Sequence, residues 1–95
     1  MTIQYSGFTV AATARTYAFR VTDTLAEARE FTVKVQLGAY HRTALRFQDG
    51  PEICLTRLKR ELEGETQESR AESHLRIEEQ DIQEYLRRRY PRKRS

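Results

Sequence analysis

The chain has 95 residues, of which 38% are hydrophobic and 33% are charged, with a single cysteine and a formal net charge of +3. This length suits one small domain with a thin core, and a lone cysteine excludes an intramolecular disulfide and a cysteine-based zinc module. No run approaches the ~18 apolar residues of a membrane span, and the chain does not open with a secretory signal, so we expect a cytoplasmic protein with no membrane partner.

Residues 1–13 contain a loosely spaced set of apolar side chains. The set comprises Ile3, Tyr5, Phe8 and Val10, with Gly7 between them. This spacing is compatible with an extra edge strand and equally with a loose N-terminal arm.

The next two segments alternate as half-buried strands do. Residues 15–22 place Tyr17, Phe19 and Val21 at every second position, and residues 29–37 continue the same pattern. Because only a short polar stretch separates them, they predict an antiparallel hairpin with one solvent-exposed face. A weaker alternation over residues 41–48 predicts a third strand.

A helix is predicted after the turn residues Asp49 and Gly50. Asp49 can cap it, and Pro51 lies in the first turn, where a missing N–H costs nothing. Over residues 51–63 the helical spacing gathers one apolar stripe, formed by Cys54, Leu55, Leu58 and Leu62. Ile53 falls nearly opposite this stripe, as either a first-turn contact or an exposed apolar residue.

The last third of the chain predicts a loop, a short strand and a second helix. Residues 65–73 are hydrophilic without apolar periodicity, and residues 74–77 are a candidate strand. Residues 78–89 predict a helix in which Ile77 and Ile82 form a hydrophobic staple if Glu78 is the cap.

Together these elements predict an α+β fold of the order β-β-β-α-β-α. We expect an antiparallel sheet of three to five strands with two amphipathic helices on one face. The expected organisation is an N-terminal arm or edge strand over residues 1–13, one domain over residues 14–90 and a basic tail over residues 91–95.

The positive charge is concentrated at the C-terminus. Residues 1–49 carry a balance of +2, residues 50–86 carry −5 and residues 87–95 carry +6. Part of this cluster complements the negative end of the helix dipole, but its continuation past the helix is available to a polyanion or an acidic partner. Tyr90 is a candidate for stacking on a base. The candidate residues are Arg87, Arg88, Tyr90, Arg92, Lys93 and Arg94.

The sequence lacks the common catalytic and cofactor-binding motifs, including phosphate-binding glycine loops and zinc-protease and nucleophile-elbow patterns. The only nucleophile–base combination is Cys54 with His41 or His74. Since Cys54 shares the apolar stripe, we expect it to pack as a small hydrophobe, and we expect no enzyme, metal or cofactor. His41 is expected at the edge of the core and His74 in solvent.

A small sheet covered on one face leaves edges that favour pairing with another strand. We therefore expect a homodimer formed through an edge strand or through the N-terminal arm, with Tyr5, Phe8 and Ile53 as candidate partner contacts. The expected function is a non-enzymatic protein-interaction module. The alternative is an accessory nucleic-acid or polyanion binder that uses the arginine-rich C-terminal segment.

Overall fold

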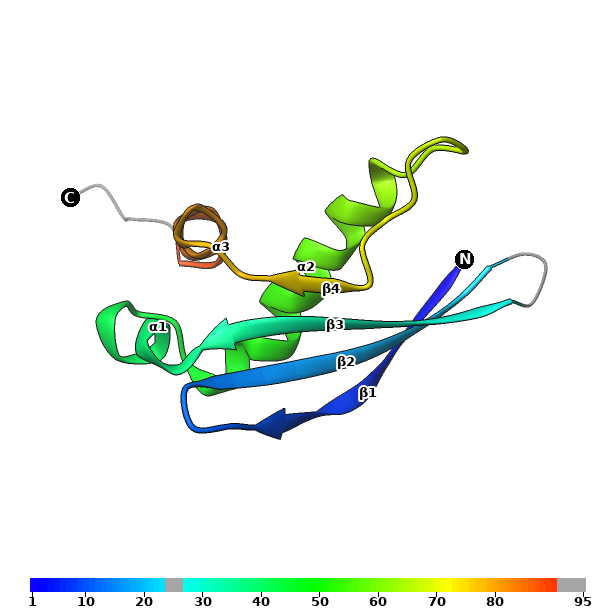
Figure 1. The fold of residues 1–95 in the computed structure, drawn as a ribbon. Coiled ribbons are helices and arrows are strands. Elements are labelled where there is room, and N and C mark those ends of the chain that lie inside the picture. The colour runs from blue at the N-terminus through cyan, green and yellow to red at the C-terminus, as the bar shows by residue number, and fades with distance from the viewer. Residues whose placement is uncertain (24–26, 91–95) are drawn as a thin grey trace.

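The computed structural model describes residues 1–23 and 27–90, and its elements form a four-stranded sheet with helices against it (Figure 1). This arrangement confirms the predicted α+β class. In chain order the elements are β1 (Thr2–Val10), β2 (Ala14–Thr22), β3 (Ala28–Gln36), α1 (Leu37–Arg42), the 3-10 helix η1 (Phe47–Asp49), α2 (Gly50–Glu63), β4 (His74–Arg76) and α3 (Glu79–Arg89).

The sheet is mixed, which corrects the prediction of a purely antiparallel sheet. Its strand order is β1-β2-β3-β4, in which β1, β2 and β3 are antiparallel neighbours and β4 runs parallel to β3. The Thr32 N–H donates to the Ser73 carbonyl and the Ile77 N–H donates to the Lys34 carbonyl, at 2.8 and 2.9 Å. The connection through α2 returns the chain to the end of the sheet from which β3 started, so β4 has to run parallel.

The third predicted strand is wrong, because residues 37–49 form α1, a turn and η1. The Thr43 hydroxyl donates to the Ala39 carbonyl at 2.7 Å and closes α1. The Arg46 N–H donates to the Asp49 carboxylate at 2.9 Å, which curls the following residues into η1. Leu45 is buried while Phe47 is exposed, so their alternation does not mark one face of a strand.

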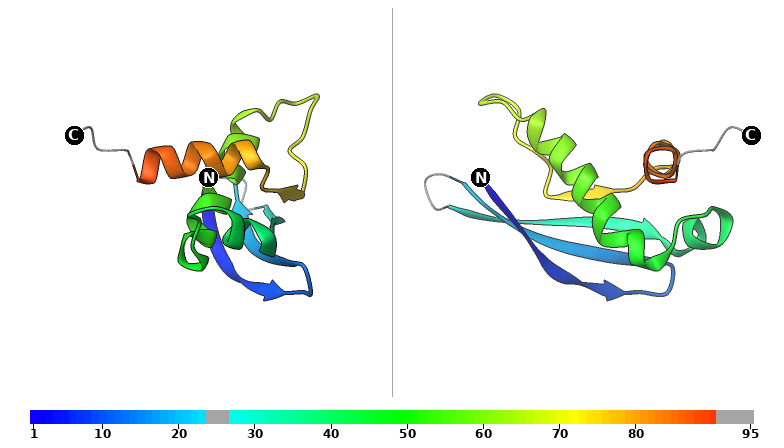
Figure 2. Two further views of the ribbon diagram at one scale, coloured as in Figure 1. Left: turned by 90° about the vertical axis from the view of Figure 1, so that its left-hand side faces the viewer. Right: turned by 180° about the vertical axis from the view of Figure 1, so that it is seen from behind.

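The core lies between the sheet and α2, which packs on β2 and β3. Figure 2 shows α2 and α3 on one side of the sheet, with the opposite side uncovered. At the start of α2 the backbone passes so close to the buried Tyr17 ring that a Cβ on Gly50 would overlap it. The predicted stripe is buried at Cys54, Leu58 and Leu62.

Helix α3 packs against α2. The Glu78 N–H donates to Asp81 Oδ2 at 2.8 Å, while Asp81 Oδ1 accepts from Arg60 Nη2 at 2.6 Å. Asp81 therefore stabilises the first turn of α3 and fixes it to α2. Ile53 is only 2% exposed in this helical layer, because α3 covers the side of α2 that lies away from the sheet. Ile53 is thus a core residue, and its proposed role as an exposed partner contact is wrong.

Candidate functional site

Strand β1 forms one edge of the sheet and pairs only with β2. Its register shifts between Tyr5 and Gly7, and Gly7 has a φ of 133°, a conformation that favours glycine. The Ala11 N–H donates to the Ala14 carbonyl at 2.8 Å. Ala11 therefore directs its backbone groups toward β2, and alternate residues of a strand direct theirs to opposite sides. Val10 and Phe8 consequently direct their N–H and C=O groups toward the open edge.

The edge of β1 has no charged side chain. Residues 1–14 contain no Asp, Glu, Lys or Arg. Edge strands of natural proteins are commonly protected by charged residues, by proline or by short length. The nine residues of β1 have only the irregularity at Gly7 as such a device.

Side chains of β1 extend the apolar face of the sheet beyond the helices. Tyr5 lies opposite Phe19 and Phe8 opposite Tyr17, with ring centroids 5.4 and 5.6 Å apart. Yet Tyr5 is 41% exposed, Phe8 47% and Val10 60%, because α2 packs on β2 and β3. These residues project from the face that carries the core and leave an apolar surface in solvent.

An arginine lies within this apolar surface. The Arg15 guanidinium carbon is 4.6 Å from the centroid of the Phe8 ring and 4.1 Å from that of Phe47. The Phe47 ring in turn lies 4.5 Å from the Tyr40 ring. We call Tyr5, Phe8, Val10, Arg15 and Phe47 the β1 surface. Sequence reasoning missed Arg15, Val10 and Phe47, because the pattern placed Phe47 in a strand and gave no signal that joined it to β1.

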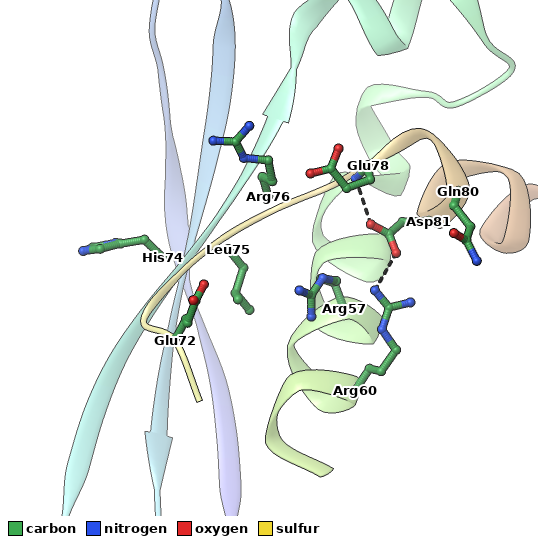
Figure 3. A pocket seen from close by; sticks show the side chains of 9 residues that line it. All are labelled: Arg57, Arg60, Glu72, His74, Leu75, Arg76, Glu78, Gln80 and Asp81. Carbon is green, nitrogen blue, oxygen red and sulfur yellow. Dashed lines mark hydrogen bonds and ion pairs between the residues drawn. The ribbon is translucent and has the colours of Figure 1, made fainter. Parts of the chain in front are cut away.

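The opposite edge of the sheet, at β4, has a different character. β4 has only three residues, and beside it lies a groove of about 460 Å³ bounded by α2 and the start of α3 (Figure 3). Two of the groove arginines have carboxylate partners: Arg57 pairs with Glu61 at 3.0 Å and Arg60 with Asp81 at 2.6 Å. The third, Arg76, forms no ion pair with another described residue. This edge is thus short and polar, and its arginines on α2 are neutralised, whereas the edge of β1 is long and uncharged.

The C-terminal candidates that the structure describes lie in different settings. Arg87 and Arg88 are exposed on α3, whereas Arg89 Nε lies 3.6 Å from Glu52 Oε2. The Tyr90 hydroxyl donates to Asp49 Oδ1 at 3.3 Å, and its ring lies under the Arg89 guanidinium. Tyr90 is therefore held against the domain. The other three candidates lie outside the described residues: Arg92, Lys93 and Arg94.

The structure does not bring the nucleophile–base candidates together. Cys54 is fully buried under β3, and burial raises the pKa of its thiol. His41 is exposed in α1, away from the core edge where it was expected, and His74 is exposed on β4. Within residues 1–23 and 27–90 no three His, Cys, Asp or Glu side chains form a group that could hold a metal, and no helix is long and apolar enough to cross a membrane.

Comparison with protein-family models, with curated proteins and with solved structures finds no match to this chain.

Proposed function

We propose that the protein is a non-enzymatic protein-interaction module that pairs with a second copy of itself along β1 to form a homodimer. The observation that carries this proposal is the coincidence of two features on one strand. The same residues, Phe8 and Val10, present unpaired backbone groups to the open edge and exposed apolar side chains beside it.

A second copy suits this edge for reasons of charge and shape. Because residues 1–14 are uncharged, two antiparallel β1 strands meet without repulsion between like charges. A two-fold axis perpendicular to the sheet puts the same face of both sheets on one side. The two β1 surfaces then lie next to each other, and each covers aromatic side chains that the monomer leaves in solvent.

The oligomeric state is the direct test. Sedimentation equilibrium of the full chain over a hundredfold range of concentration is expected to show a reversible change from monomer to dimer mass. A monomer mass throughout would reject the proposal.

Substitution at Val10 locates the interface. Val10→Pro removes an N–H that faces only the open edge, and proline is tolerated at edge positions of this kind. We expect this variant to remain folded and to be monomeric. Val10→Ala keeps the N–H and loses the side chain, so we expect an intermediate dissociation constant, while Gln83→Lys on the exposed side of α3 serves as the control. Dimerisation of Val10→Pro with the wild-type dissociation constant would contradict the assignment to β1.

A further inference from the structure

The uncovered face of the sheet carries two cations side by side. Lys34 on β3 and Arg76 on β4 are Cα partners across the parallel pair, so their side chains project next to each other. Both residues are exposed. Figure 3 shows His74 and Arg76 on the other side of β4 from Leu75, which points toward α2.

Neither cation has a counter-ion within the part of the chain that the structure describes. Their neighbours in the strand register are Thr16, which lies opposite Lys34 on β2, and Thr32 and His74 one pair further along. Glu72 and Glu78 line the groove beside Arg76, but neither forms an ion pair with it. The nearest acidic residue of β3 on the same face, Glu30, lies opposite Arg20 in the register. Like charges at directly opposite positions destabilise a sheet, so the fold tolerates an unfavourable pair here.

Further donors surround this pair. His74 Nδ1 lies 2.7 Å from the Thr32 hydroxyl, which holds the imidazole on the same face. Since the Ser73 carbonyl and the Ile77 N–H bond to β3, alternation directs the N–H groups of His74 and Arg76 toward the open edge. Two cations and an imidazole thus lie together on one face of β3 and β4, and two N–H groups of β4 point toward the adjacent open edge.

We propose that Lys34, His74 and Arg76 form a binding site for a phosphate group. A guanidinium donates two parallel hydrogen bonds to phosphate and an ammonium adds a point charge, so a bound phosphate removes the repulsion between the two side chains. Apart from the His74 imidazole, which is bonded to Thr32, the strands place no aromatic ring on this face for base stacking. Recognition is therefore of the phosphate itself, as a free ion or in a nucleic-acid backbone, and it is independent of pairing along β1.

Sodium pyrophosphate is the probe for the first arm of the test. Titration of the full-length protein, followed by amide chemical shifts at constant ionic strength, is expected to shift His74 and Arg76 more than sodium chloride does. We expect Arg76→Gln to weaken pyrophosphate binding about tenfold, as the loss of one charge-assisted contact implies. Lys59→Gln, which removes an exposed cation from α2, is expected to leave the dissociation constant unchanged.

A second arm distinguishes the sources of the phosphate. A single-stranded oligothymidylate that binds more tightly than pyrophosphate, with an affinity that falls steeply with salt, identifies a nucleic-acid backbone as the ligand. Equal or weaker binding of the oligonucleotide identifies a free phosphate compound. The inference is overturned if pyrophosphate causes no more change than chloride, or if Arg76→Gln and Lys59→Gln bind it equally.

Discussion

Glu65 is a single carboxylate that connects three segments, and its replacement by glutamine tests the electrostatic reasoning most directly. Its two oxygens accept from the Arg29 guanidinium at 2.6 and 3.1 Å, and the Ala71 N–H donates to it at 2.9 Å. Arg70 approaches at 3.4 Å. Glu65→Gln keeps the shape of the side chain but removes the charge that the Arg29 pair requires. We expect the variant to fold with reduced stability.

The size of the effect follows from the pKa of this carboxyl. Hydrogen bonds from Arg29 and from the Ala71 N–H lower the pKa of Glu65 from 4.5 to about 2. Each pKa unit corresponds to 1.36 kcal/mol, so this lowering of the pKa corresponds to roughly 3.4 kcal/mol in the free energy of unfolding. The two side chains retain 21% and 16% exposure, so we reduce the expected loss to about 2 kcal/mol at pH 7.

The sign of the pH dependence is fixed by the lowered pKa. The stabilisation is complete above pH 4.5 and is lost as the pH falls toward 2, so less than about half of it remains near pH 3. Urea unfolding of wild type, Glu65→Gln and the exposed control Glu68→Gln at several pH values measures this directly. A difference between wild type and Glu65→Gln that stays constant from pH 7 to pH 3 would refute the reasoning, as would an equal loss in Glu68→Gln.

Two further predictions concern the core. Gly50→Ala is expected to cost about 2 kcal/mol or more in the free energy of unfolding, because the added Cβ overlaps Tyr17, and the cost is expected to fall in a Tyr17→Phe background; an unchanged urea midpoint would be evidence against the close approach. The Cys54 thiol is expected to react with a disulfide reagent far more slowly in native than in urea-unfolded protein, since burial hides it and raises its pKa; equal rates would contradict its burial.

The sequence predicted the elements whose burial follows a simple period along the chain. The alternation of Tyr17, Phe19 and Val21 identifies β2, because this strand lies between β1 and β3 and only one of its faces is covered by the core. The stripe that contains Leu58 identifies α2. By contrast, residues 41–48 alternate over too few positions to distinguish a strand from a turn, and α1 occupies part of them.

The remaining features depend on contacts between distant segments. The direction of β4 follows from the path of α2 across the sheet, which no local periodicity records. Ile53 lies opposite the apolar stripe of α2 and would be exposed on an isolated helix, but it is buried because α3 packs over it. For the same reason Tyr5 and Phe8 could be proposed as partner contacts from sequence, but their association with Arg15 could not.

The position of β4 has a consequence for the order in which the molecule assembles. β1, β2 and β3 form a meander of neighbours in the chain, whereas the contact between Thr32 and His74 spans 42 residues. Contacts over such distances form late, since a long loop has to close before they contribute. During synthesis β3 therefore remains an outer strand until residues 74–76 have emerged. Until then the nascent sheet has two unprotected edges, at β1 and at β3, and the folded sheet has one long unprotected edge, at β1.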